Sequence, residues 1–418
     1  MQAETDVVAV ELEKVAANVP TLMERDDTFY ATIEKRPVEV ISNRDMRIPL
    51  ELVPNGSFGH FDPEDGDLGV GGAPKFDKAV INTVYLRHAV QWSKKAEWST
   101  EDKRKAVLSA FKHLMSTSMQ EFRRQIDALC MTAGDGKLAT ITSVSTAGSV
   151  DTYTCTTDGF GVRLLRVGQK VCVYNAGMTA LVNANGENIA ITAVDYAAKT
   201  VTLASLVTSS VAGCVLLMEN LSGSTPASLK GVPYHHNSAS TGYWLGLDRA
   251  TYSQIRANRV TAGGGGLSLP YPRLAINKVG DRIGQDHAKK PTAWMHPCQK
   301  QAYEELGMLV SMINKTAKDE ALDLYFGDSM QIAGAPIKTS YSWDKTRIDF
   351  IVNDVWGRAE MKPAGFYEVD GEKIFEMRGA SGGVKASQIF YLIIAFNLFV
   401  NAPPACSYID TLSVPSGY

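Results

Sequence analysis

The sequence lacks the short patterns that mark common catalytic and metal-binding proteins. Its six cysteines stand singly, with no Cys-x-x-Cys pair, so neither a zinc ribbon nor a redox motif is expected. It contains no His-Glu-x-x-His and no Gly-x-Ser-x-Gly pattern, which removes two frequent hydrolase signatures. Its carboxylates are scattered, and no pair stands out as acid and base. We therefore expect no catalytic residue, no metal site and no cofactor.

A strong charge bias and long hydrophobic runs are also missing. The net charge of −3 argues against a dedicated binder of nucleic acid or of an anionic membrane. The longest apolar run, Ile389 to Val400, is interrupted by Asn397 and fits a buried strand better than a membrane span. Residues Met1 to Glu13 are acidic and lack the basic segment of a secretory signal. We expect a chain with no membrane partner.

What the sequence does contain is the material for a large globular fold. Its 418 residues are 45% hydrophobic and 21% charged, enough for about two to four domains. Single, scattered cysteines of this kind are most often small buried side chains in a reducing compartment.

The most strongly patterned stretch predicts one long helix from Ser99 to Ala133. Ser99 suits the N-cap, Asp102 follows three residues later, and Gly134 begins the stop signal. Its apolar stripe consists of Val107, Phe111, Leu114, Met115, Phe122, Ile126 and Leu129. Lys103, Arg104, Lys112, Glu121, Arg123 and Arg124 fall mostly on the opposite face. No partner heptads follow, which disfavours a coiled coil. At about 50 Å this helix would be a spine on which other elements lie.

Two segments before this helix have too little apolar sequence to fold alone. Residues 1–36 read as an arm of two short helices divided at Pro20. Residues 37–98 read as a long hairpin, with strands at Met46–Val53 and Ala79–Gln91. A long two-stranded hairpin is marginal by itself, so we expect both segments to lie on a neighbour.

The predicted tip of the hairpin, residues 54–78, is rich in glycine and proline. Its few apolar side chains are Phe58, Phe61, Leu68, Val70 and Phe76. Ordering so many permissive residues costs about 1–2 kcal/mol each, which these few side chains cannot recover within one subunit. We predict a tip that becomes ordered only against another molecule.

After the spine, the sequence changes to short alternating strands rich in Thr, Ser and Val. Residues 137–225 predict a small barrel or sandwich of their own, and Asn185-Gly186 reads as a hairpin turn. The part before residue 160 has no clear assignment. The strands are predicted at Lys170–Tyr174, Ile189–Asp195, Lys199–Ala204 and Cys214–Met218.

The remaining chain alternates helices with buried strands. Helices are predicted at Asp248–Val260, Pro272–Ala288 and Gln299–Asn314. Strands are predicted at Thr292–His296, Gly334–Ile337, Arg347–Val352, Gly365–Val369 and Lys373–Met377. Asp370-Gly371 should join the last two as a hairpin, with Lys373–Met377 pairing back.

Several residue groups could carry chemistry, but each has a simpler reading. Gly134-Asp135-Gly136-Lys137 lacks the glycine spacing and the Ser or Thr of a phosphate-binding loop, so it reads as a helix-ending turn. Asp62, Glu64, Asp65 and Asp67 have the wrong order for a calcium loop and read as a solvated tip. Gly69–Gly72 and Gly263–Gly266 lack the dinucleotide spacing and read as loops.

One pair of histidines and one histidine–cysteine pair could also carry chemistry. His235 and His236 would point apart on a strand, which makes them a poor joint metal site. His296 and Cys298 flank Pro297 and could be ligands or a nucleophile pair, yet no second histidine or acidic cluster supports them. We expect structural roles for all four.

The order of the parts resembles the major capsid proteins of tailed bacteriophages, which have the Hong Kong 97-type fold. Leu269–Gly284, followed by Pro291–Pro297 and a helix, resembles the axial domain of that family. Gly334-Ala335-Pro336-Ile337 resembles its turn into a strand, and Gln388–Ile409 resembles its C-terminal ending.

The resemblance implies an α+β capsid fold with an inserted small all-β domain. Its implied parts are residues 1–36 as N-terminal arm, 37–98 as extended hairpin or E-loop, 99–136 as spine helix of the peripheral domain, 137–225 as inserted β domain, 226–340 as axial domain and 341–418 as the β-rich peripheral and axial C-terminal part.

The implied function is a virion shell. Copies of the chain would form the hexamers and pentamers of an icosahedral shell around double-stranded DNA. Further implied partners are scaffold, portal and decoration or cement proteins, with assembly in the host cytoplasm. Some members crosslink hairpin lysines; Lys75 and Lys78 are available, but no acceptor or catalytic acid can be matched. Two alternatives stay open: an encapsulin-like nanocompartment shell, and an enzyme whose site has no linear motif.

Overall fold

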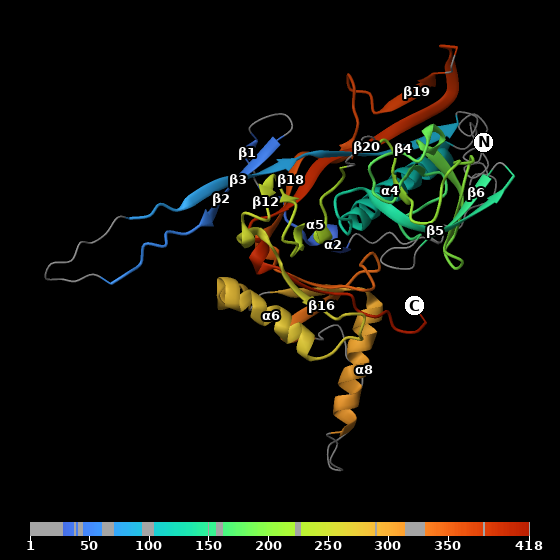
Figure 1. Ribbon diagram of the computed structural model, residues 1–418. Coiled ribbons are helices and arrows are strands. Elements are labelled where there is room, and N and C mark those ends of the chain that lie inside the picture. Colours follow the sequence, from blue (N-terminus) through green and yellow to red (C-terminus); the bar gives the residue numbers. More distant parts are fainter. Residues whose placement is uncertain are drawn as a thin grey trace. The chain divides into compact units, whose positions relative to one another are not determined.

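The computed structural model describes residues 28–36, 39–40, 45–60, 71–93, 104–148, 150–155, 162–221, 227–288, 291–313, 331–378 and 381–417. The chain divides into two compact units. The first is drawn from residues 1–31, 83–127 and 360–397, and the second from residues 32–82, 128–359 and 398–418. Helices and strands are mixed in both, in agreement with the expected α+β class (Figure 1).

The first unit is built around one long strand, β20 (Val384–Val400), which contains the predicted apolar run. Strand β4 (Val84–Ser93) pairs with it antiparallel, from Ser387 opposite Ser93 to Phe396 opposite Val84. On the other side of β20 lie β18 (Trp356–Phe366) and β19 (Ile374–Arg378). Alternation places His88 of β4 over Phe122 of α4, with the rings stacked at 6.1 Å.

The spine helix α4 runs from Arg104 to Leu129. The proposed cap at Ser99 lies outside the described residues, as does the side chain of Phe111. Phe122 and Ile126 are buried, as their stripe predicts. Arg124 is also buried, which corrects its placement on the polar face. The helix ends before Ala133 because a turn follows, in which the Thr132 hydroxyl donates to the Leu129 carbonyl at 2.8 Å.

A short helix, α2 (Thr28–Thr32), is fixed to the C-terminal end of α4. The backbone N–H groups of Phe29 and Tyr30 donate to Asp127 Oδ1 at 2.9 and 2.7 Å. Asp127 is buried, so it caps the free amides at the start of α2 without solvent competition. The Tyr30 ring also meets Phe396 edge-on at 5.7 Å.

In the second unit, residues 137–218 form a closed antiparallel barrel in the strand order β10-β5-β6-β9-β8-β7. The strands are β5 (Lys137–Ala147), β6 (Val150–Cys155), β7 (Lys170–Tyr174), β8 (Ile189–Asp195), β9 (Thr200–Leu203) and β10 (Val215–Met218). The predicted strands are confirmed, and the unassigned lead-in supplies β5 and β6. Asn185-Gly186 is not a hairpin turn: it lies in the 3-10 turn η2 (Ala184–Gly186).

The ends of the barrel segment leave the rest of the unit side by side. Ala133 and Lys230 form an antiparallel bridge, and the Ser228 N–H donates to the Gly134 carbonyl at 2.8 Å. Gly231 passes so close that a Cβ there would lie 2.1 Å from the Cys130 carbonyl oxygen. Only glycine fits at this crossing.

A mixed six-stranded sheet in the order β13-β21-β17-β14-β16-β15 forms the other large part of the unit. Its strands are β13 (Asn258–Thr261), β14 (Thr292–Met295), β15 (Gln331–Ile332), β16 (Ala335–Thr339), β17 (Ile348–Ile351) and β21 (Ser407–Asp410). The helices near it are α6 (Pro270–Ile283) and α8 (Pro297–Ile313), and α7 (Gln285–Ala288) follows α6 (Figure 1). The predicted helix at 272–288 is thus two helices, divided at Gly284, whose φ is +88°.

The helix predicted over Asp248–Val260 is wrong. The segment instead holds part of the small hairpin β11 (Tyr243–Trp244) and β12 (Leu247–Asp248), the turn η3 (Ser253–Ile255) and the first residues of β13. Asp248 accepts the Ala250 N–H at 3.0 Å and the Thr251 hydroxyl at 2.9 Å, a local turn that competes with helix.

The predicted hairpin exists, but its second strand is shorter than expected. Strands β1 (Glu39–Val40), β2 (Asp45–Val53) and β3 (Lys75–Asn82) form an antiparallel sheet (Figure 1). The single strand expected over 79–91 is two strands, because the chain leaves the hairpin at Thr83 and continues as β4 in a different sheet. Along the paired strands, Met46, Leu52, Ala79 and Ile81 are buried with Trp244 and Leu245, and this paired part is the base of the hairpin.

The last corrections concern the C-terminal third. Asp370 and Gly371 both have positive φ and form the predicted turn. The strand after it, β19, does not pair back on residues 365–369; it pairs with β20, Phe375 opposite Ile389. The turns η4 (Asn353–Val355) and η5 (Pro403–Ala405) flank the end of β20.

Candidate functional site

One group of buried ionisable side chains surrounds Asp349 of β17. Its Oδ1 accepts hydrogen bonds from Arg347 Nη2 at 2.7 Å and from His236 Nδ1 at 2.8 Å. Its Oδ2 accepts from Arg347 Nε at 2.9 Å and from Trp343 Nε1 at 3.0 Å. The guanidinium of Arg347 lies 4.2 Å from the centre of the Tyr408 ring. Both carboxylate oxygens are therefore fully occupied.

The protonation states of this group are fixed. Burial alone would raise the pKa of Asp349, but Arg347 and His236 outweigh burial and hold that pKa below its ordinary value. Burial lowers the pKa of His236 despite the neighbouring carboxylate. Because an ionised carboxylate only accepts, the neutral His236 ring donates through Nδ1. A carboxylate locked in this way has no free position to act as base or metal ligand.

His235 carries its proton on the other nitrogen. Trp244 Nε1 can only donate, so His235 Nδ1 accepts from it at 3.1 Å. Nε2 then donates to the Leu398 carbonyl at 3.1 Å. Burial lowers the pKa of His235 to about 3. The two histidines end the short helix α5 (Val232–His235), not a strand, and each ring has its own partners.

The His296 and Cys298 pair also serves the fold. The Cys298 N–H, in the first turn of α8, donates to His296 Nδ1 at 3.1 Å, so the imidazole caps this helix. Burial lowers the pKa of His296 to about 3 and raises the pKa of the Cys298 thiol. The pair is therefore a neutral thiol beside a neutral imidazole, the opposite of an activated thiolate.

The described glycine-rich segments that were weighed as binding loops form turns and do not come together in one site. Gly134 to Lys137 form a turn into strand β5, where the Lys137 N–H donates to Asp135 Oδ1 at 3.1 Å. The Gly264 N–H donates to the Thr411 carbonyl at 2.7 Å, which fixes the second glycine loop. The acidic tip and Gly69 lie outside the described residues.

The two hairpin lysines have local partners. Lys75 Nζ lies 5.1 Å from the centre of the Tyr252 ring, and a hydrogen bond to Tyr252 raises the pKa of Lys75. The backbone N–H of Lys78 donates to Asp77 Oδ1 at 2.8 Å. The Asp77 carboxylate thus contacts the backbone of Lys78 and not its Nζ.

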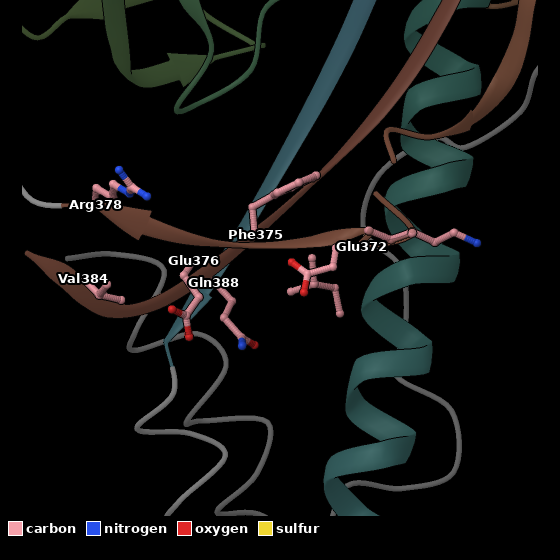
Figure 2. Close-up of a pocket in the computed structure, with 9 residues that line it drawn as sticks. Glu372, Phe375, Glu376, Arg378, Val384 and Gln388 are labelled. Atoms are coloured by element: carbon pink, nitrogen blue, oxygen red, sulfur yellow. The ribbon is translucent and has the colours of Figure 1, made fainter. Parts of the chain in front are cut away.

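A surface depression follows β19 and the start of β20 (Figure 2). Glu376 and Gln388 are cross-strand neighbours in it, and Figure 2 shows their side chains close together. Its wall carries both Glu372 and Arg378, and most of its lining residues are exposed. A binding pocket for a small molecule is normally enclosed and largely apolar, which this depression is not.

Exposed apolar side chains gather instead on the hairpin beyond its base. Phe58 is 99% exposed and Phe76 is 64% exposed, and Val53, which is paired with Lys75, is also exposed. Such residues at the end of two paired strands are a surface that association would bury. Sequence reasoning had singled out both phenylalanines.

The sheet of the first unit carries a second apolar surface that sequence reasoning missed. Tyr367, Phe375 and Tyr391 form an aromatic cluster with ring centres 5.9–6.5 Å apart. On β4, Tyr85 is 66% exposed and its hydroxyl lies 3.7 Å from Met361 Sδ. These side chains come together only because their strands pair with β20, and nothing in the sequence alone reveals that pairing.

No group of three or more His, Cys, Asp or Glu side chains within the described ranges is placed to hold a metal ion. No helix in the part of the chain that the structure describes is long and apolar enough to cross a membrane.

Comparisons with known proteins give a fold and no close relative. No protein-family model matches the sequence. No curated protein matches it either. Similar solved structures include the capsid asymmetric unit of cyanophage A-1(L), with a TM-score of 0.56 and 10% identity over 96% of this chain and 97% of that chain.

Two further solved structures are similar at a lower level. The capsid of a native GTA particle has a TM-score of 0.49 and 10% identity, over 96% of this chain and 95% of that one. The holo-SrpI encapsulin complex from Synechococcus elongatus PCC 7942 has a TM-score of 0.44 and 10% identity, over 99% and 97%. The cyanophage likeness carries the conclusion: this chain has the fold of a phage capsid protein, as the resemblance in its sequence implied.

Proposed function

We propose that this chain is the major capsid protein of a tailed phage, which assembles with copies of itself into the hexamers and pentamers of an icosahedral shell around double-stranded DNA. The observation that carries the proposal is the likeness to the cyanophage capsid subunit over nearly the whole of both chains. A partial match could reflect a shared domain, whereas this one includes nearly every part of the chain.

The hairpin supports self-association. Its base is anchored by buried residues, but beyond Val53 the described chain is exposed and includes Phe58 and Phe76. Burying such side chains stabilises a contact by about 1.5–3 kcal/mol each at full burial. A neighbouring copy is the partner present at the highest concentration in a shell, and repeated contacts of this kind close into rings.

The proposed roles of the parts follow the same reading. Residues 226–340 form the axial part around the ring centre, and α4 with its sheet forms the peripheral part. The arm, residues 1–36, and the hairpin, residues 37–98, reach neighbouring copies. Residues 137–225 form a surface module. Scaffold, portal and decoration proteins are further partners, and assembly takes place in the host cytoplasm.

The buried ionisable groups agree with a structural role. Asp349, His235, His236 and His296 each have partners within the fold and protonation states that oppose acid–base chemistry near neutral pH. With a net charge of −3, the shell wall would hold packed DNA without strong attachment.

The test is assembly of the full-length chain, produced alone and with candidate scaffold. Sedimentation velocity should show particles of megadalton mass, and electron microscopy should show closed icosahedral shells. Particles from infected cells should contain double-stranded DNA. Closed shells filled with a protein cargo instead would favour a nanocompartment, and monomers and dimers under every condition would overturn the proposal.

A further inference from the structure

The sequence contains the dipeptide Asn-Gly twice, at Asn55-Gly56 and at Asn185-Gly186. Asn-Gly is the dipeptide most prone to spontaneous deamidation, because glycine has no Cβ to hinder attack by its own backbone nitrogen on the asparagine side chain. The reaction needs that nitrogen to be free and the backbone to rotate. The two copies differ in both respects.

Asn55-Gly56 lies in an open environment. Residues 54–60 are exposed and outside any strand. A Cβ built on Gly56 would meet nothing within 4 Å, and within the described residues the Gly56 amide has no backbone acceptor. Asn55 Oδ1 accepts the Ser57 N–H at 3.0 Å, which folds the side chain forward along the Gly56 peptide. In an Asx turn of this kind the asparagine side chain lies along the following peptide, which carries the nitrogen that would attack Cγ.

Asn185-Gly186 is closed to the same reaction. The Gly186 N–H donates to the Asn183 carbonyl at 2.9 Å inside the turn η2. Gly186 is buried, and a Cβ on it would lie 3.2 Å from the Val173 carbonyl oxygen. Attack would require the Gly186 N–H to leave the Asn183 carbonyl and the turn η2 to open, so the folded structure protects Asn185.

We propose that Asn55 is a site of spontaneous deamidation, which places an aspartate or isoaspartate at the base of the hairpin tip. The Gly56 nitrogen loses its proton and bonds to Asn55 Cγ, and the side-chain nitrogen leaves as ammonia. The resulting five-membered succinimide then takes up one water, which opens it to aspartate or isoaspartate. The net change is one amide converted to one carboxylate, with no oxidant or enzyme required.

The modification adds a negative charge where the two sides of the tip meet. Ser57 Oγ accepts the Gly72 N–H, and Asn55 Oδ1 holds Ser57, so Asn55 is the first link of that connection. An isoaspartate also inserts a methylene into the backbone, which displaces Ser57 from its partner. The hairpin tip of an aged subunit therefore differs in both charge and geometry from that of a new one.

The test is peptide mass spectrometry of full-length subunits incubated unassembled near pH 8 and sampled over time. Asn55 should convert steadily, with both acidic products resolved by retention time, while Asn185 stays unchanged in the folded protein. Gly56→Ala should remove most of the conversion at Asn55, and the open space around Gly56 makes this variant structurally neutral. Equal rates at Asn55 and Asn185, or no effect of Gly56→Ala, would overturn the proposal.

A second experiment rests on the proposed function, and its outcome can be distinguished from that of the first. If the hairpin is buried against a neighbouring copy, Asn55 should convert more slowly in closed shells than in free subunits. Fast conversion in both states would leave the modification site intact and would contradict the hairpin contact.

Discussion

The barrel and the hairpin are both made of antiparallel strands, yet they solve the problem of strand edges in opposite ways. The six barrel strands close on one another, and Val173, Leu203 and Leu216 are among the buried side chains of their inner face. The hairpin has a buried base and an exposed end carrying Phe58. One region is complete within a single chain, and the other acquires its stability from a partner.

The largest expected effect comes from the barrel core. Leu216→Ala should lower the free energy of unfolding of the unassembled subunit by about 2–5 kcal/mol, because Leu216 lies in the barrel interior and is fully buried. Phe58→Ala should change it by less than about 0.5 kcal/mol, because that ring is exposed. Urea unfolding measures both, and similar losses would mean that the hairpin is already packed within its own subunit.

For shell assembly, in contrast to subunit stability, a hairpin substitution should have a larger effect than a barrel substitution. Phe76→Ala should leave subunit unfolding unchanged but raise the concentration needed for shell assembly about tenfold, which corresponds to roughly 1.4 kcal/mol per contact. Val211→Ala is the matched control, since Val211 is 60% exposed on the barrel and Phe76 is 64% exposed. Light scattering during assembly gives the threshold. An equal rise for Val211→Ala would place the barrel in the shell contacts too.

Acid should destabilise the rest of the second unit more than the barrel. The barrel segment, residues 137–221, contains no histidine, whereas burial lowers the pKa of His235 and His296 to about 3. The unfolded chain binds these protons below about pH 6.5, so stability is complete above that pH and falls as the pH drops toward 3. Each histidine contributes up to about 1.4 kcal/mol per pH unit.

His296→Asn isolates one of these terms, because asparagine keeps an acceptor for the Cys298 N–H but does not titrate. The slope of unfolding free energy between pH 6 and 4 should decrease in this variant. An unchanged slope would show that His296 is protonated in the folded state at those pH values.

Deletion of the whole barrel is expected to have the smallest effect on shell assembly. Residues 135–227 replaced by a short Gly-Ser bridge should leave shell assembly intact, because the Ser228 N–H already lies 2.8 Å from the Gly134 carbonyl oxygen. Electron microscopy of shells from this variant is the measurement, with the excised barrel checked separately for cooperative unfolding. Loss of subunit folding would show that the barrel is integral to its unit.

Local patterns in the sequence were sufficient where an element is determined by its own residues. The alternation at Ile189–Asp195 and the stripe of α8 predicted a strand and a helix that exist. Local patterns failed where the bounds of an element depend on pairing with a segment that is distant in the sequence. Nothing local marks Thr83 as the point where one strand becomes two, because the cause is the pairing of β4 with β20, some 300 residues later.

The same limit applies to the candidate sites. His235 and His236 are adjacent in sequence, but their roles follow from Trp244, Leu398 and Asp349, which the fold brings together. Sequence reasoning identified the exposed phenylalanines of the hairpin because their glycine-rich surroundings cannot bury them. It missed the cluster of Tyr367, Phe375 and Tyr391 because β20 assembles it.

The paired strand ends at Ala133 and Lys230 have a consequence for descent as well as for folding. A segment whose ends already touch can be lost, replaced or enlarged in one genetic event without moving anything on either side. Gly231 is the fixed point of this arrangement, since any larger residue would collide with the Cys130 carbonyl. Related chains are thus free to carry quite different domains at this position, or none, and would be expected to keep a glycine at the crossing.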